Sequence, residues 1–143
     1  MSIELLPAAQ ISATGLSAEK ARMQIAANNM ANAHSTRGKD GQVYHRKVAV
    51  FSAVYKDKLG FNDNTDSLNG VDMVEVAEGR NPTQMVYMPY HPDADKNGMV
   101  EMPNISPIEE MLDMITATRA YEANLSVMKQ SKEMADKTIT MTR

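Results

Sequence analysis

Cysteine is absent from this 143-residue sequence, and so is tryptophan. Disulfide bonds, thiolate nucleophiles and cysteine-based zinc sites are therefore excluded. Five tyrosines and two phenylalanines are the only aromatic residues, whereas methionine occurs 13 times. Methionine serves as ordinary core filler in many proteins. A chain poor in rigid rings and rich in flexible thioethers nevertheless suits adaptable helix interfaces better than a tight catalytic pocket.

An excess of positive charge is also missing, because the net charge is -3. This balance disfavours nucleic-acid binding, which needs clustered Lys and Arg. A small basic group does occur, and we interpret it as a solvated loop and strand edge. It consists of Arg37, Lys39, Arg46 and Lys47.

Long apolar runs are missing as well, since no stretch approaches the about 20 apolar residues of a membrane-spanning helix. The first 15 residues do not predict a cleaved secretion signal. Glu4 stands where such a signal has basic residues, and Pro7 interrupts the short apolar run.

No catalytic constellation is present in the sequence. His34, His45 and His91 are scattered and form no metal-binding spacing. Glu109 and Glu110 are adjacent, but acidic residues in the first turn of a helix are expected from the helix dipole alone. We therefore expect no enzymatic activity, no cofactor and no metal ion.

The first segment predicts a helix over residues 8–33. Leu16, Met23, Ala27 and Met30 lie on one narrow apolar seam, three of them with the seven-residue spacing of a coiled coil. The remaining surface is small and mostly uncharged, which indicates that the helix contacts neighbours on more than one side.

Three asparagines stand close together near the end of this helix, although Asn is a poor helix-interior residue. They are Asn28, Asn29 and Asn32. Two interpretations remain open. The amides form a polar contact that sets the register between packed helices, or the helix end simply frays into the following loop.

The middle segment, residues 36–104, predicts short antiparallel strands. The prediction rests on apolar residues that alternate along the chain and on the turn-forming residues Gly, Asn, Asp and Pro between these stretches. The expected strands cover residues 43–55, 71–78, 83–90 and 98–104.

The stretch "HPDADKNG", residues 91–98, begins like an EF-hand calcium loop. The bidentate Glu of that loop is replaced by Asn104, and the flanking segments are extended rather than helical. Asn97 and Gly98 favour a tight turn, and Asp93 and Asp95 can cap backbone amides. The preferred interpretation is a β-hairpin with an eight-residue polar connector. A small calcium-binding or regulatory module is the alternative.

The last segment predicts a helix that begins at Pro107, after Ser106 at the N-cap and with Glu109 completing a capping box. A heptad-like apolar seam then runs towards the C-terminus, formed by Met111, Met114, Thr118, Tyr121, Leu125, Met128 and Ala135. The expected fold is α+β. Long N- and C-terminal helices (1–35 and 105–143) form a coiled-coil-like pair, and a small antiparallel β-rich domain (36–104) lies between them in sequence.

The two ends together resemble the terminal motifs of the flagellar rod and hook axial proteins. The N-terminal match is carried by Ser12, Gly15, Leu16, Ala18, Arg22, Met23, Ala27, Asn28, Asn29, Met30, Ala31, Asn32 and Thr36. The C-terminal match is carried by Glu109, Glu110, Met111, Met114, Ile115, Ala117, Arg119, Ala120, Tyr121, Ala123 and Asn124. The "HPDAD" hairpin narrows the resemblance to a proximal rod member of that family.

The resemblance implies a structural subunit of the proximal rod of the bacterial flagellar basal body, which assembles into a helical tube and transmits motor torque. It implies export by the flagellar type III apparatus without a cleaved signal, and a periplasmic rod. The implied partners are the rod proteins FlgB, FlgF and FlgG, the adaptor FliE, the ring protein FliF and the export apparatus. Another rod protein, similar to FlgB, is the alternative within the family.

From the seams and the resemblance together, we expect a set of subunit-interface residues on the two helices. They are Leu16, Met23, Ala27, Asn28, Asn29, Met30, Asn32, Met111, Met114, Thr118, Tyr121, Asn124, Leu125 and Met128.

Overall fold

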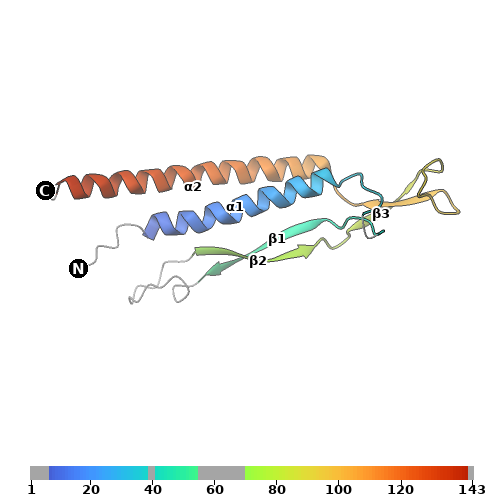
Figure 1. Ribbon diagram of the computed structural model, residues 1–143, viewed down its shortest axis with the longest axis horizontal. Helices are drawn as coiled ribbons and strands as arrows, with labels where there is room; N and C mark the ends of the chain where they lie inside the picture. Colours follow the sequence, from blue (N-terminus) through green and yellow to red (C-terminus); the bar gives the residue numbers. More distant parts are fainter. Residues whose placement is uncertain (1–6, 39–40, 55–69, 142–143) are drawn as a thin grey trace. The chain divides into compact units, whose positions relative to one another are not determined.

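A computed structural model describes residues 7–38, 41–54 and 70–141 of the chain. In chain order its elements are α1 (Pro7–Ala31), β1 (Lys47–Val54), β2 (Gly70–Glu78), β3 (Thr83–Tyr87), β4 (Met99–Pro103) and α2 (Pro107–Met141) (Figure 1). The predicted α+β class, with one long helix at each end and antiparallel strands between them, is confirmed. Among the described helices, none combines the length and apolar character needed to cross a membrane.

The helix boundaries follow from local signals. α2 starts at Pro107, as predicted, because proline at the first helical position loses no intrahelical hydrogen bond. The backbone N–H of Glu110 donates to the carbonyl of Ser106, which closes the first turn. α1 ends at Ala31, two residues earlier than predicted, and the amide of Asn32 turns back to the carbonyls of Asn28 and Asn29.

The strands form two separate two-stranded sheets, β1–β2 and β3–β4. β1 begins at Lys47 rather than at residue 43, so the preceding residues are not part of the sheet. Tyr44 and Arg46 instead direct their side chains to polar partners on the helices. Tyr55, the last residue of the first expected strand, lies outside the described residues.

β3 and β4 form an antiparallel hairpin in which Met85 pairs with Glu101 and Tyr87 with Met99. Val100, on the opposite face, is buried. β3 stops at Tyr87 instead of continuing to residue 90, so the connector spans residues 88–98 and is longer than predicted. The chain already turns at Met88, whose carbonyl accepts a hydrogen bond from the amide of His91.

The described chain separates into two compact units, each containing part of both helices. Among the described residues, the first unit comprises 7–21, 50–54, 70–75 and 116–141, and the second comprises 22–38, 41–49 and 76–115. Both units are described separately below.

The first unit joins α1 and α2 through small side chains. The Cβ of an alanine at Gly15 would lie 3.0 Å from the side-chain nitrogen of Asn124, so the helices approach closely at this point. The buried helix positions described in this unit are Ser12, Ala18, Ala117, Ser131 and Ala135. Because these residues are small, the two backbones come near each other and the larger apolar side chains lie beside or outside the contact.

The second unit has a small apolar core formed by Ala26, Ala33, Val100, Pro103 and Ile105. Alongside this core, Asn29 and Glu110 are each only 1% exposed. Buried amide and carboxylate groups are stable only when their hydrogen-bonding capacity is used. The contacts of these two residues therefore define the most distinctive site in the chain.

Candidate functional site

Asn29 lies at the centre of a group that we call the polar junction, formed by Asn29, Tyr44, Arg46, Lys47 and Glu110. The Asn29 side-chain NH₂ donates to Glu110 Oε2 at 3.0 Å and to the Lys47 carbonyl at 2.8 Å. Its Oδ1 accepts from the Lys47 backbone N–H and from the Tyr44 hydroxyl, both at 3.0 Å. An amide side chain has two donor hydrogens and two acceptor lone pairs, and here all four are used.

Glu110 brings a negative charge into this buried position, and Arg46 compensates it. Arg46 Nε and Nη2 both lie 2.7 Å from Glu110 Oε1. The other carboxylate oxygen accepts the hydrogen bond from Asn29. A buried carboxylate is costly unless it is both paired and hydrogen-bonded, and Glu110 meets both conditions.

Tyr44 closes the polar junction from the loop that precedes β1. Burial raises the pKa of the Tyr44 hydroxyl above its ordinary value, and the nearby negative charge of Glu110 adds to this effect. The hydroxyl therefore stays protonated at neutral pH and can donate its hydrogen bond to Asn29.

The elements explain why these side chains meet. Asn29 lies in the last turn of α1, Glu110 lies in the first turn of α2, and Lys47 is the first residue of β1. The Asn29 amide pairs with both backbone groups of Lys47, as a neighbouring strand would. The polar junction thus fixes the position of α1, α2 and the start of β1 within the second unit.

Two further ion pairs accompany the polar junction in this unit. Arg22 on α1 lies 2.8 Å from Asp113 on α2, and His45 lies 2.9 Å from Glu78. These side chains are partly exposed, so each pair contributes on the order of 1 kcal/mol or less. The first pair supports the contact between α1 and α2, and the second joins the segment before β1 to the end of β2.

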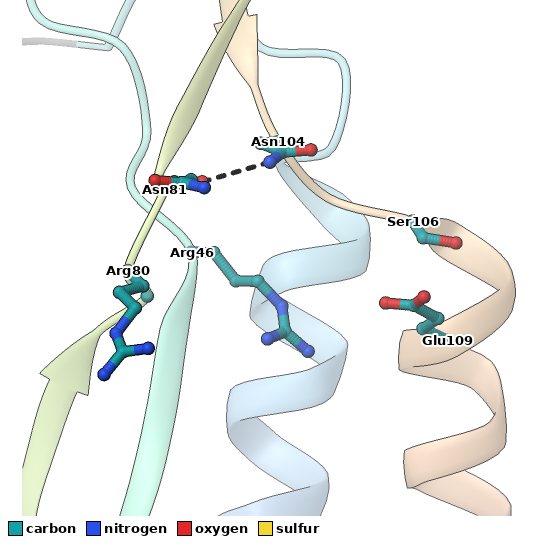
Figure 2. Close-up of a pocket in the computed structure, with 7 residues that line it drawn as sticks. Arg46, Arg80, Asn81, Asn104, Ser106 and Glu109 are labelled. Carbon is teal, nitrogen blue, oxygen red and sulfur yellow. Dashed lines mark hydrogen bonds between the residues drawn. The ribbon is translucent and has the colours of Figure 1, made fainter.

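A polar pocket of about 360 Å³ borders the polar junction. Figure 2 shows Arg46 and Arg80 on the strand side and Ser106 and Glu109 at the start of α2. Between them, the Asn104 side chain donates a hydrogen bond to the carbonyl of Asn81. Two arginines and one glutamate line the pocket. Because Arg46 is already paired with Glu110, the charges of Arg80 and Glu109 remain, and no single class of ligand is indicated.

The connector of the hairpin is a closed turn rather than a calcium loop. Asp95 Oδ1 accepts hydrogen bonds from the amides of Asn97 and Met99, as an Asx-type cap does. Gly98 has a φ of +74°, in the left-handed region that favours glycine. Asn97 has a negative φ, because no described residue other than glycine has a positive one.

Asp93 has a different role from the predicted amide cap. Its carboxylate accepts a hydrogen bond from the Thr36 hydroxyl at 2.9 Å and lies 3.4 Å from Arg37. Across residues 7–38, 41–54 and 70–141, no three His, Asp or Glu side chains gather in a way that could hold a metal ion. The carboxylates of the turn thus serve the fold, and the calcium alternative gains no support.

The three neighbouring asparagines of α1 and its end do not all fit one of the two interpretations. Asn29 forms the polar contact between helices that the first interpretation expected. Asn28 is exposed, and Asn32 lies just beyond α1 with its side chain donating to the carbonyl of Asn28, as the second expected.

The other expected interface residues are half-buried or exposed, and among them Asn124 lies against Gly15 of α1. Ala27, Met111 and Thr118 are exposed. Half-buried positions are Leu16, Met23, Met30, Met114, Tyr121, Asn124, Leu125 and Met128. The predicted seams therefore flank the buried centre, which consists of smaller residues.

Sequence reasoning missed the roles of three residues in the polar junction. Arg46 was assigned to a solvated basic group, and that was wrong, because it pairs with buried Glu110. Glu110 was interpreted only as a first-turn acid, and Tyr44 only as a strand residue. The one available signal was that Asn29 and Glu110 both belong to the terminal motifs.

Similarity to known proteins extends over almost the whole chain. The family described as flagellar basal body rod FlgEFG protein C-terminal matches residues 96–141. The flagellar basal-body rod protein FlgC of Salmonella typhimurium is 37% identical over 137 residues, which are 96% of this chain and 97% of that protein.

Distant bacteria provide similar matches. The FlgC protein of Aquifex aeolicus is 39% identical over 136 residues, covering 95% of this chain and 96% of that protein. The FlgC protein of Borreliella burgdorferi is 36% identical over 141 residues, covering 91% and 92%. At this identity and coverage, the chain belongs to the FlgC family of flagellar basal-body rod proteins.

Proposed function

We propose that this chain is a structural subunit of the proximal rod of the bacterial flagellar basal body. The observation that carries the proposal is its similarity, over almost its whole length, to proteins named flagellar basal-body rod protein FlgC. Such a subunit assembles with other rod components, and we infer that it does so as part of a helical tube that transmits motor torque.

The exposed apolar side chains of α2 support an assembly role. In the second unit, Ile108, Met111, Leu112 and Ile115 form an exposed apolar stripe along α2, and Ile108 is 80% exposed. In the first unit, Val127, Met134, Ile139 and Met141 are exposed on the same helix. Large apolar side chains at helical spacing indicate surfaces that other chains cover.

The polar junction supports a mechanical role within the subunit. A rod that carries torque needs each subunit to keep a fixed geometry between its helices and its strands. Fully satisfied buried polar networks favour one arrangement, because any shifted arrangement leaves a donor, an acceptor or a charge without its partner. The hydrogen bonds of Asn29 and Glu110 supply this kind of restraint.

We propose that the interface with neighbouring subunits comprises the expected residues other than Asn29, which holds the helices together inside its own chain. Thirteen residues remain on the two helices after that exception. They are Leu16, Met23, Ala27, Asn28, Met30, Asn32, Met111, Met114, Thr118, Tyr121, Asn124, Leu125 and Met128.

The proposal extends to organisation, location and partners. The segments 1–35, 36–104 and 105–143 act as N-terminal helix, β-rich middle domain and C-terminal helix. The subunit is not an enzyme, leaves the cytoplasm through the flagellar export apparatus without a cleaved signal, and joins a periplasmic rod. Its neighbours are FlgB, FlgF and FlgG, the adaptor FliE and the ring protein FliF.

Peptide mass spectrometry on detergent-purified basal bodies from the source bacterium tests the proposed function. We expect peptides of this chain at an amount comparable to those of other rod proteins, and their loss when the rod is removed from the preparation. Intact rods that lack the chain would contradict the proposal.

A further inference from the structure

The β3–β4 hairpin exposes an unusual share of the chain's few aromatic residues. We call Met85, Tyr87, Met88 and Tyr90 the tyrosine patch. Tyr90 is 100% exposed and Tyr87 is 68% exposed, although the whole chain has only five tyrosines. Tyrosine is enriched among the residues that contribute most to protein–protein binding. Packing within the chain gives no reason for Tyr90 to stand here, because a fully exposed side chain buries no surface against its own chain.

Tyr87 and the backbone of Met88, within the tyrosine patch, are held by contacts with Gly98 in the turn. A side chain added at Gly98 would meet the ring of Tyr87 at 3.0 Å and Pro89 at 3.1 Å, so both pack directly over this glycine. The amide of Met88 donates to the Gly98 carbonyl, and Asp95 ties the turn to the start of β4. A surface ordered in advance loses little conformational entropy when a partner binds.

The charges beside the tyrosine patch indicate the chemistry of the partner. Glu101 is exposed and pairs with Met85 across the hairpin, so both side chains lie on the same face. Asp95 is exposed in the turn, with Lys96 as the hairpin's single basic residue other than histidine. Tyrosine rings attract guanidinium and ammonium groups, and nearby carboxylates add to that attraction.

A second copy of the chain fits this surface poorly. Three of its arginines are already paired with carboxylates of their own chain: Arg22 with Asp113, Arg37 with Asp93 and Arg46 with Glu110. Binding to a second copy would have to break such pairs or rely on other cations, and the net charge of each copy is -3.

From these observations we infer that the tyrosine patch docks a different polypeptide, one that presents arginine or lysine between apolar side chains. The inference rests on the proposed function, because that partner belongs to the same basal body. The hairpin thus provides a contact separate from the helices.

Site-specific photocrosslinking in the source bacterium tests the inference. The full chain, carrying benzoylphenylalanine in place of Tyr90, replaces the native copy, and crosslinked peptides from purified basal bodies are identified by mass spectrometry. We expect crosslinks to a segment of another protein with arginine or lysine between apolar residues. Gln84 provides a matched control position, because it is exposed on the opposite face of the same hairpin.

The outcomes separate the inference from the proposed function. Absence of the chain from basal bodies contradicts the function itself. Its presence there with no crosslink from position 90, with a crosslink to a second copy, or with a crosslink to an acidic segment, overturns the inference alone. Equal yields from positions 84 and 90 also overturn it, because the contact is then not specific to this face.

A charge-reversal substitution provides a second test of the inference. Glu101→Lys is expected to lower the crosslink yield from position 90 by about tenfold, because it opposes a basic partner. Glu75→Lys, an exposed control on β2, is expected to change the yield less than twofold. An unchanged yield in Glu101→Lys, at equal incorporation into basal bodies, overturns the basic character of the partner.

Discussion

The two compact units use the same pair of helices but join them by different means. In the first unit, small side chains such as Ala117 and Gly15 let α1 and α2 approach closely. In the second unit, Asn29 and Glu110 join them through hydrogen bonds and a buried ion pair. A contact of small residues depends on shape and is sensitive to added volume. A polar contact depends on chemistry and is sensitive to the loss of one partner.

This difference assigns separate tasks to the two units. The small-residue contacts of the first unit restrain the helices through shape, as at Gly15 and Asn124. The polar junction permits one register, because a shift would separate Arg46 from the buried carboxylate of Glu110. The second unit therefore determines how α1, α2 and β1 meet, and the first unit extends the helix pair.

The largest effect is expected from Glu110→Ala in the second unit. The substitution leaves Arg46 without its carboxylate and removes an acceptor from Asn29, so we expect the unfolding free energy to fall by about 3–5 kcal/mol. Urea unfolding of the purified chain measures it. Glu109→Ala, at an exposed neighbouring position, is the matched control and should cost less than about 1 kcal/mol. Equal losses of unfolding free energy in the two variants would show that the polar junction does not stabilise the second unit.

Asn29→Leu is expected to cost about 2–3 kcal/mol, because Tyr44, Glu110 and the backbone of Lys47 lose partners in a buried place. Asn28→Leu, one residue earlier and exposed, should stay within about 0.5 kcal/mol of the wild type. The same urea experiment compares the two. If the leucine at position 29 were tolerated equally well, the amide would not be setting the register.

In the first unit, Ala117→Leu tests sensitivity to added volume. Ala117 is fully buried, so the larger side chain must push α1 and α2 apart, and we expect a loss of about 1–3 kcal/mol. Ala123→Leu makes the same change at an exposed position of α2 and should have little effect. Thermal unfolding of both variants measures the difference. Tolerance of leucine at 117 would mean that close approach is not what holds this unit.

The smallest expected effect concerns Tyr44 and pH. Its pKa is raised in the folded chain, so the protonated hydroxyl is favoured there. The resulting stability is present in full below pH of about 10, and is lost as the pH rises through the folded pKa. Tyr44→Phe should cost about 1 kcal/mol near neutral pH. Unfolding curves from pH 8 to 11 should show the difference in unfolding free energy between wild type and variant becoming smaller as the pH rises. A difference that grows with pH would contradict the expected sign.

Local signals in the sequence predicted the elements well. Proline at the first helical position marked the start of α2, and the Asp95–Gly98 stretch marked the hairpin turn. These predictions succeed because capping and turn formation involve residues only a few positions apart. The start of β1 was predicted too early because Tyr44 and Arg46 are occupied by the helices, a contact that no local pattern contains.

The polar junction shows where sequence reasoning ends. The terminal motifs singled out Asn29 and Glu110, but not their contact with each other, with Arg46 or with Tyr44. Arg46 and Glu110 are 64 positions apart, so no local pattern links them. An Arg within a small group of basic residues usually remains solvated, and that was the prediction for Arg46. Likewise, the apolar seams of both helices were visible, but the choice of small residues for the buried centre was not.

The sequence by itself determined the α+β organisation, the positions of both helices and the turn chemistry of the hairpin, since each depends on neighbouring residues. It also carried the terminal motifs that relate the chain to flagellar rod proteins. Only the tertiary structure decided that Asn29 and Glu110 are buried together, that Ala117 is buried whereas Met111 is exposed, and that Tyr90 faces solvent. Burial depends on what the rest of the chain places nearby, and that is a property of the folded arrangement, not of local sequence.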